Sequence, residues 1–321
     1  MKLWGGPSDS GCCSVADVED ARRVCQQLGI PHHVFNFTAE FEREVVGPYV
    51  AAHARATTPN PCIACNAHLK FDRFLQRARL LGFDAIVTGH HARVTWSGGV
   101  WQLRRGKDAA KDQSYVLYML GQPELAQLRL PVGELTKQEV RRLAARIGLR
   151  TADKPDSQDV CFISKAGGRA SFLAGRIPLG PGRLITATGD DLGPVDALEL
   201  VTVGQRRGLG LTPHKRPERR YVVNVDLSNR TATLGALDDL MVRAVALRGL
   251  SWTERPLWPG SRVQAQLSAH GVPASGRWEG AGSSGAVVLD QRVRRVAAGQ
   301  AVVLYAPDDA GDIVAGGGTA A

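Results

Sequence analysis

Two cysteines three positions apart, Cys62 and Cys65, are the residues of this chain best suited to covalent chemistry. They follow the rigid segment Pro59-Asn60-Pro61, and the apolar residues after them recur at helical spacing up to a stop signal at Gly82. This pattern predicts an amphipathic helix with Cys65 at or just before its first turn. Unpaired backbone N–H groups and the helix dipole stabilise a thiolate there, so we expect Cys65 to be reactive, provided that its thiol is partly exposed.

The Cys-x-x-Cys spacing suits a redox or nucleophilic site, half of a zinc site, or simple packing. Zinc would need two further ligands. The four other cysteines form no second Cys-x-x-Cys pair; they are Cys12, Cys13, Cys25 and Cys161. The spacing alone leaves the three alternatives open, and we predict no metal site. Cys161 follows the polar segment Asp156-Ser157-Gln158 and, taken by itself, is expected to pack as a small hydrophobic side chain.

Two further polar segments are candidate binding residues. Gly89 and His90 come directly after the apolar stretch 85–88, which predicts a short buried strand, and ligands of parallel sheets lie beyond the carboxyl ends of strands. A hydrogen-bonded surface histidine is the alternative for His90. The stretch Lys111-Asp112-Gln113 is basic and polar, and it is either a binding segment or a solvated loop.

The charge of the whole chain indicates a polyanionic partner. Its 40 lysines and arginines outnumber its 31 aspartates and glutamates, which gives a formal net charge of +9 and a pI near 9.5. Nucleic acid is favoured over a membrane because the sequence has no basic amphipathic anchor and no apolar run of membrane-spanning length. Six cysteines in 321 residues are no disulfide scaffold, and the start lacks an apolar leader, so we expect a cytoplasmic protein.

Helical and strand patterns alternate over residues 1–165, which predicts an α/β domain with a parallel sheet and crossover helices. Beyond Ala166 the chain changes to short strands separated by glycine and proline, which predicts a small linking domain over 166–235 and a compact β-barrel over 236–321. The elements expected in the first domain are a helix after Ser14 with Cys25 in its buried face, a strand over 33–37, a helix opened by Thr38, a hairpin around Gly98-Gly99 and a helix with a capping box from Thr136 to Glu139. The later strands are expected at 183–185, 200–203, 221–225, 231–234, 241–247, 261–267, 285–289 and 301–304, with a last strand or a frayed end at the C-terminal glycines.

Seven short motifs of the chain occur together and in a fixed order. As a set they closely resemble the bacterial tRNA-specific 2-thiouridylase (MnmA) family over essentially the whole chain. The resemblance implies an adenine-nucleotide-hydrolase-like α/β domain, a linking domain and a C-terminal barrel that contacts tRNA. The motifs are Thr58-Pro59-Asn60-Pro61-Cys62 with Cys65-Asn66, Lys70-Phe71, Thr88-Gly89-His90, Lys111-Asp112-Gln113-Ser114-Tyr115, Asp156-Ser157-Gln158, Cys161-Phe162-Ile163 and Val203-Gly204-Gln205-Arg206.

The resemblance implies an ATP-dependent reaction, with Mg²⁺, that transfers persulfide sulfur to C2 of the wobble uridine of tRNA through an adenylated uridine. By the same resemblance Cys161 carries the persulfide, Cys65 is the nucleophile that releases the sulfur, and the two form a disulfide between turnovers. The implied partners are the anticodon stem-loop of tRNA and a persulfide donor protein or cysteine desulfurase, with no membrane.

The resemblance also assigns binding residues. Met1 and Gly89 would approach the nucleotide. Asn60, Pro61 and Cys62 would line the flipped uridine, whose extrusion from an anticodon loop costs little. Contacts to the rest of the tRNA would come from His90, Lys111, Asp112, Gln113 and Gln300.

The chain departs from the family pattern in two places. The family opens with a strand and a Ser-Gly-Gly-x-Asp-Ser loop for the ATP pyrophosphate. On this interpretation the chain begins inside the second strand, without roughly 35 residues of one strand–helix–strand unit. Cys62 stands where some members carry an acidic residue. Two hypotheses follow: a thiouridylase whose true start lies upstream, or a truncated tRNA-binding or sulfur-accepting paralogue that cannot activate uridine. Without that loop we expect no tRNA-dependent release of pyrophosphate.

Overall fold

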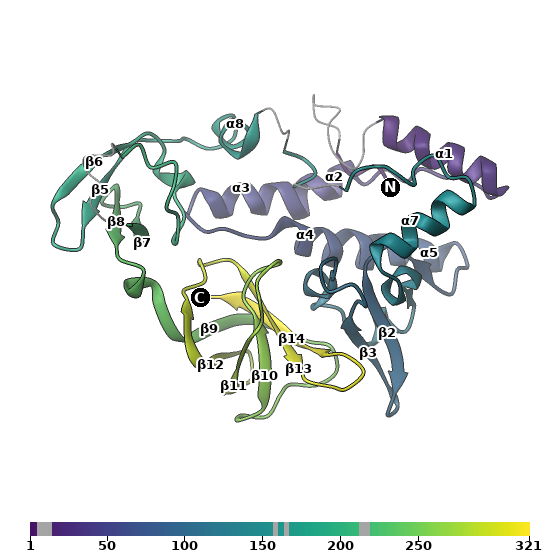
Figure 1. The fold of residues 1–321 in the computed structure, drawn as a ribbon. Helices are drawn as coiled ribbons and strands as arrows, with labels where there is room; N and C mark the ends of the chain where they lie inside the picture. The colour runs from purple at the N-terminus through teal and green to yellow at the C-terminus, as the bar shows by residue number, and fades with distance from the viewer. Residues whose placement is uncertain (5–14, 157–159, 164–166, 212–218) are drawn as a thin grey trace. The chain divides into compact units, whose positions relative to one another are not determined.

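The computed structural model describes residues 1–4, 15–156, 160–163, 167–211 and 219–321, and these form two compact units (Figure 1). The first unit contains residues 1–48, 61–117 and 123–175, and the second contains 49–60, 118–122 and 176–321. The second unit therefore holds most of the predicted linking domain together with the barrel.

Helices are the main elements of the first unit, and the helix Gly47–His53 continues from it into the second unit. Two runs of consecutive helices pack against each other, and each contains a π-helical segment: α2, η1 and α3 in one, and α4, η2 and α5 in the other. The apolar positions expected after Thr38 are buried in the first run, with Phe41, Val45 and Val46 each no more than 1% exposed. The helices are α1 (Val15–Leu28), α2 (Thr38–Phe41), η1 (Glu42–Val46), α3 (Gly47–His53), α4 (Pro61–Ala64), η2 (Cys65–Arg73), α5 (Phe74–Leu80), η3 (Ser114–Leu117), α6 (Gln122–Leu125), η4 (Pro131–Glu134), α7 (Lys137–Arg146) and α8 (Gly168–Ala174).

The strands of the first unit are a parallel pair and a hairpin. Strand β1 (Ile86–Val87) pairs in parallel with β4 (Leu128–Arg129), and a parallel bridge joins Lys2 to Asn36. Strands β2 (Ala92–Ser97) and β3 (Val100–Arg105) form the expected hairpin. Its two-residue turn, Gly98-Gly99, has positive φ at both positions, which is the conformation that a type I′ turn requires and that glycine adopts without strain.

The part of the second unit that follows α8 begins with a four-stranded sheet in the order β6-β5-β8-β7. Strands β5 and β8 run parallel, and the outer pairs are antiparallel. One face covers a core that includes Leu184, Leu198, Val222 and Leu234. The elements are β5 (Gly182–Thr186), β6 (Asp191–Val195), η5 (Leu198–Leu200), β7 (Tyr221–Asp226), β8 (Thr231–Gly235) and η7 (Asp238–Leu240).

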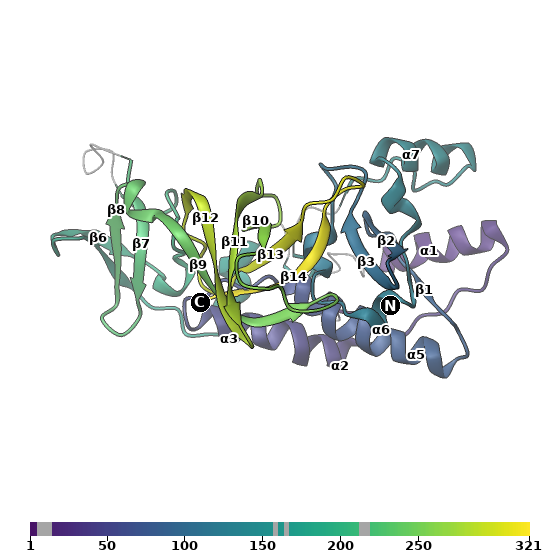
Figure 2. The same cartoon turned by 90° about the horizontal axis from the view of Figure 1, so that it is seen from below.

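The C-terminal strands close into a six-stranded antiparallel barrel (Figure 2). The order is β13-β10-β11-β12-β9-β14, and β13 pairs with β14 to complete the ring, so the barrel itself has no open edge. Trp278 fills its interior, and glycines are required at 280 and 285 because a Cβ there would lie within 2.6 Å of the indole. The strands are β9 (Met241–Trp252), β10 (Arg262–Gln266), β11 (Ala274–Ala281), β12 (Ser284–Arg294), β13 (Ala301–Ala306) and β14 (Ile313–Ala320).

Several local expectations are wrong. The strand expected over 33–37 is reduced to the bridge at Asn36. No residue of α1 is buried, and Cys25 is half-buried rather than part of a core. The strand expected over 200–203 is replaced by the end of helix η5 and a loop, while β6 and β11 were not expected. Cys12, Cys13 and the Ser157-Gln158 part of the motif Asp156-Ser157-Gln158 lie outside the described residues, and so does Ser14, after which a helix was expected.

Candidate active site

The Cys-x-x-Cys pair lies inside a helix and not before it. The helix begins at Pro61, because proline is well suited to the first helical position, so Cys62 lies in the first turn and Cys65 in the next. Cys62 is exposed, whereas Cys65 is only 7% exposed. The expectation that Cys65 lies at or just before the first turn is therefore wrong, and the condition for its reactivity, a partly exposed thiol, is not met. Cys65 instead begins the π-helical segment η2, a conformation that occurs frequently at functional sites.

The positive charge of Lys70 affects the pKa values of both Cys62 and His90. Desolvation by the surrounding protein raises the pKa of the Cys62 thiol, although the residue as a whole is exposed, and the Lys70 charge opposes this shift. Burial, together with the nearby positive charge of Lys70, lowers the pKa of His90 to about 3. At neutral pH this part of the site therefore holds a protonated thiol, a neutral imidazole and an ammonium group.

The His90 ring is fixed by its neighbours. The Thr88 hydroxyl and His90 Nδ1 lie 2.8 Å apart, and the ring of Phe71 packs at 5.7 Å from the imidazole centroid. His90 is 9% exposed, so the alternative of a surface histidine does not describe it. Because it is neutral, His90 can offer a substrate a hydrogen bond but not a cationic contact to phosphate.

Gly89 lies just beyond the carboxyl end of β1, where ligands of parallel strands bind. The residue is exposed, and a Cβ built on it would meet no atom within 4 Å. A bulky ligand can therefore approach this backbone closely. Met1, the other residue expected near a nucleotide, is 37% exposed and precedes the bridge between Lys2 and Asn36.

Cys161 is half-buried and lies beside an aromatic anchor. The adjacent Phe162 is 2% exposed and packs against Phe41 of α2 with ring centroids 5.6 Å apart, and against Phe172 at 5.2 Å. Helix α2 also packs against η2, which begins with Cys65. The two cysteine-bearing segments thus share one short helix as packing partner, and both cysteines are present as thiols, with no disulfide between them.

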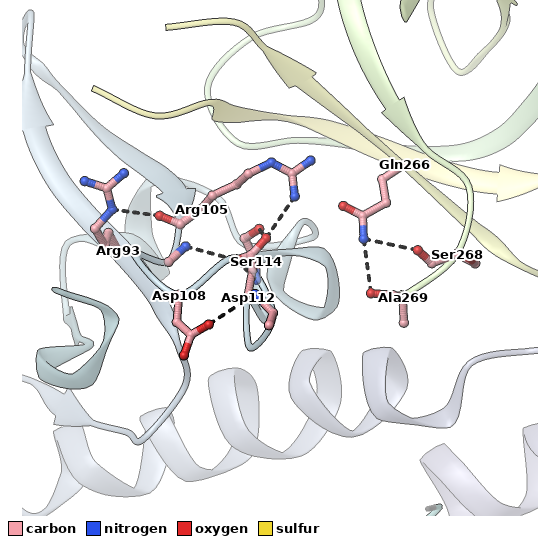
Figure 3. A network of polar contacts seen from close by, with 10 residues as sticks. Arg93, Arg105, Asp108, Asp112, Ser114, Gln266, Ser268 and Ala269 are labelled. Atoms are coloured by element: carbon pink, nitrogen blue, oxygen red, sulfur yellow. Dashed lines mark hydrogen bonds and ion pairs between the residues drawn. The ribbon is translucent and has the colours of Figure 1, made fainter. Parts of the chain in front are cut away.

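The side chains of Asp112, drawn in Figure 3, and of Gln113 form hydrogen bonds within the protein. Asp112 is 6% exposed and accepts hydrogen bonds from the backbone N–H groups of Gly106 and Ser114, from the Ser114 hydroxyl, and from Arg105 at 2.9 Å. The Gln113 side-chain oxygen accepts a bond from His91 N–H at 2.9 Å. These two residues therefore shape the loop after β3.

Lys111, the third residue of this motif, is more open to solvent. Its side chain is 41% exposed and binds Asp156 at 3.0 Å. The lysine therefore links the loop after β3 to the polar segment that precedes Cys161.

In the second unit, Gln300 donates a hydrogen bond to the carbonyl oxygen of Thr58 at 2.5 Å, and Thr58 N–H donates to Ala298. Gln300 therefore fixes the chain two residues before Asn60. Figure 3 also shows Gln266, which binds the carbonyl groups of Ser268 and Ala269 and so orders the turn after β10.

Some residues at the site were not among the predicted site residues. Lys70 stood in a quoted motif, but only the fold shows that its positive charge acts on both Cys62 and His90. Asn66 is 1% exposed and donates to Val116, while its Oδ1 has no hydrogen-bond partner among the described residues. The position of Asn66 directly after Cys65 is the feature of the sequence that could have identified it as a site residue.

The described ranges contain no group of three or more His, Cys, Asp or Glu side chains that could hold a metal ion. Within the same ranges, no helix combines the length and apolar character that crossing a membrane would require.

Comparison with known proteins identifies the family. Residues 1–165 match the family model described as tRNA methyl transferase HUP domain, and residues 242–320 match the one described as aminomethyltransferase beta-barrel domain. The tRNA-specific 2-thiouridylase MnmA of Corynebacterium diphtheriae is 41% identical over 317 residues, which cover 97% of this chain and 86% of that protein. The chain belongs to the tRNA-specific 2-thiouridylase family. The 2-thiouridylases of Saccharopolyspora erythraea and Salinispora tropica are 42% and 44% identical, over 95% and 97% of this chain and 85% and 86% of their own lengths.

Membership of the 2-thiouridylase family confirms the resemblance carried by the short motifs. The expected fold class is confirmed as well, since a HUP-type α/β domain with parallel strands precedes a closed β-barrel.

Proposed function

We propose that the protein is a tRNA sulfurtransferase that replaces the C2 oxygen of the wobble uridine with sulfur in an ATP-dependent reaction. Cys161 carries the sulfur as a persulfide, and Cys65 releases it. The observation that carries this assignment is the shared packing of both cysteine-bearing segments against α2, in a chain that is 41% identical to a 2-thiouridylase. Burial of Cys65 is compatible with this role, because the atom that it attacks belongs to the same chain.

The sulfur transfer proceeds in two displacements. The outer sulfur of the Cys161 persulfide attacks C2, so a C–S bond forms and the C2–O bond breaks with loss of AMP. Cys65 then attacks Cys161 Sγ. A Cys65–Cys161 disulfide forms, and the bond between Cys161 and the transferred sulfur breaks, with its electron pair on the 2-thiouridine. A thiol reductant supplies two electrons that restore both thiols, and a persulfide donor protein or cysteine desulfurase reloads Cys161.

ATP, bound with Mg²⁺ near Gly89 and Met1, would supply the adenylyl group that makes the C2 oxygen part of a leaving group. The exposed backbone of Gly89 at the end of β1, where a Cβ would meet no atom within 4 Å, leaves room for a nucleotide to approach. Asn60, Pro61 and Cys62 line the extruded uridine, and the raised pKa of Cys62 keeps that side chain an uncharged thiol beside the base. Neutral His90 holds the substrate by hydrogen bonding, and Lys111 and Gln300 add contacts to the anticodon stem-loop.

Because a chain without the family's pyrophosphate loop is expected to release no pyrophosphate, the test compares the 321-residue chain with a longer form that carries this loop. It combines unmodified tRNA, Mg-ATP and a persulfide donor, and measures 2-thiouridine and AMP by mass spectrometry. The products are expected from the longer form. Cys161→Ser is expected to abolish both a covalent RNA adduct and the product. Cys65→Ser is expected to stop after the first displacement and to accumulate a protein–RNA adduct that dithiothreitol cleaves. The control Cys25→Ser alters a half-buried thiol on α1 and should leave the reaction unchanged.

An adduct that forms on Cys65, or product formation that does not depend on Cys161, would overturn the assignment of the two cysteines. A protein that binds tRNA or accepts persulfide sulfur, but forms neither AMP nor 2-thiouridine, would instead be a tRNA-binding or sulfur-accepting paralogue.

A further inference from the structure

Three cationic side chains in the first unit surround one carboxylate. Asp156 binds Lys111 at 3.0 Å, Lys137 at 3.1 Å and Arg141 at 3.4 Å. The cations come from two separate segments, the loop after β3 and helix α7, and Asp156 comes from a third. Side-chain exposures of 32% to 42% leave all three cations within reach of a ligand from solvent.

The lysines are held in place through their backbones by Asp108. Its Oδ2 accepts a bond from Lys137 N–H at 2.9 Å, and its carbonyl oxygen accepts one from Lys111 N–H at 3.0 Å. The capping box between Thr136 and Glu139 fixes the start of α7 as well. The cluster is therefore built on an ordered frame, and the entropy cost of gathering its charges is reduced before any ligand arrives.

The charges within the cluster do not balance. Three cations bind one carboxylate, which leaves a formal excess of +2. Glu139 nearby is paired with Lys107 at 3.4 Å, and Asp108 accepts the backbone N–H of Lys137, so counting these three groups as well still leaves a formal excess of +1. A second group of ion pairs, between α1 and the segment after α7, has no such excess. There Lys154 and Arg150 pair with Asp17 and Asp20, so the charges cancel.

We propose that Lys111, Lys137 and Arg141 form a phosphate-binding site in which a substrate phosphate shares or takes the place of the Asp156 carboxylate. Phosphate offers three oxygens and a negative charge to donors gathered in this way. Only Lys111 was expected to contact tRNA, so the inference adds Lys137 and Arg141 of α7. The Asp156 carboxylate would compete with the phosphate for the same three cations. It rests on the proposed function, which supplies two sources of phosphate, the tRNA backbone and ATP.

The lysines hold the pKa of Asp156 at about 2, so its carboxylate remains charged at neutral pH. This leads to a prediction of opposite sign for two variants. Loss of a cation should weaken phosphate binding, while Asp156→Asn should strengthen it several-fold by removing the competing charge. An ion network with a purely structural role would instead make both changes lower stability and leave ligand affinity alone.

The experiment measures binding of a labelled anticodon stem-loop RNA by fluorescence anisotropy over a salt series, without any sulfur transfer. Lys137→Gln and Arg141→Gln are each expected to weaken binding about tenfold at low salt, and to reduce the slope of log affinity against log salt by about one. The control Arg142→Gln removes an equal charge from the neighbouring position on α7, outside the cluster, and should have little effect. Melting temperatures show that each variant is folded.

Equilibrium dialysis with ATP alone and with inorganic pyrophosphate alone identifies the source of the phosphate. Weaker RNA binding with unchanged ATP binding assigns the site to the tRNA backbone, and the reverse assigns it to the nucleotide. Unchanged affinity for both, an equal effect of Arg142→Gln, or weaker binding by Asp156→Asn would overturn the inference. A wild-type protein that bound neither ligand would overturn the proposed function as well.

Discussion

Replacing Asp112 with alanine is expected to open the loop between β3 and η3. The buried carboxylate accepts bonds from Gly106 N–H at 3.0 Å, Ser114 N–H at 3.0 Å, the Ser114 hydroxyl at 2.8 Å and Arg105 at 2.9 Å. Asp112→Ala removes the acceptor for all four donors at once. Asp112→Asn keeps the shape of the side chain and loses only the charge and part of the accepting capacity.

The size of the effect follows from the burial of these donors. Each buried backbone N–H left without an acceptor costs about 1–3 kcal/mol, and Gly106 and Ser114 supply two of them. Arg105 adds less, because its side chain is 21% exposed and water can solvate the guanidinium group. We therefore expect Asp112→Ala to destabilise the loop by about 3 kcal/mol, within the range of about 3–5 kcal/mol for breaking a buried pair. Asp112→Asn should cost about half as much.

Hydrogen exchange measured by mass spectrometry reports this loop directly. A loss of about 3 kcal/mol raises the equilibrium constant for local opening roughly a hundredfold, so peptides covering residues 105–114 should exchange faster by that factor. The control Asp308→Ala removes a carboxylate that accepts Ala310 N–H at an exposed turn of the second unit, and it should leave those peptides unchanged. Weaker RNA binding by Asp112→Ala with unaltered exchange would refute this reasoning, because Asp112 would then act by direct contact with RNA.

Three further predictions concern the first unit. His90 has a pKa of about 3 when folded and about 6.5 when unfolded, so between these values the unfolded chain binds a proton that the folded chain does not. The free energy of unfolding therefore falls as the pH drops from about 6.5 toward 3. In His90→Gln, urea unfolding at a series of pH values should show a weaker pH dependence of this free energy over that window. Gly133→Ala places a Cβ 1.7 Å from the carbonyl oxygen of Ala92, so it should destabilise the unit by several kcal/mol and lower its melting temperature, and an unchanged value would contradict the packing of η4 on β2. Iodoacetamide mapped by peptide mass spectrometry should label exposed Cys62 before buried Cys65, and increasingly so as the pH rises toward the raised pKa of Cys62; faster labelling of Cys65 would contradict its burial.

Patterns that depend on a few neighbouring residues were predicted well. The Gly98-Gly99 hairpin, the capping box from Thr136 to Glu139 and the helix stop with positive φ at Gly82 all appear as expected. Each is determined by local backbone conformation or by hydrogen bonds within one turn, so the sequence contains all the partners. The predicted start of the helix that carries Cys62 and Cys65 was wrong, because Pro61 is compatible both with a loop and with a first helical turn.

Burial was predicted less well because it depends on what packs against an element. The apolar positions of α1 have helical spacing, yet none of that helix is buried, whereas Cys65 is buried by helices distant in sequence. Strands β6 and β11 carry glycine and charged residues, and their pairing with neighbouring strands compensates for a weak strand signal.

The sequence by itself determined the family, the order of α/β domain and barrel, and the candidate residues for chemistry, because these reside in residue types and their spacing. Only the tertiary structure decided that the Lys70 charge acts on Cys62 and His90, that Phe162 anchors the Cys161 segment on α2, and that three cations surround Asp156. The physical reason is common to all three. Coulomb interactions, desolvation and packing act through distances of a few ångströms in space, and those distances exist only once segments far apart in the chain have come together.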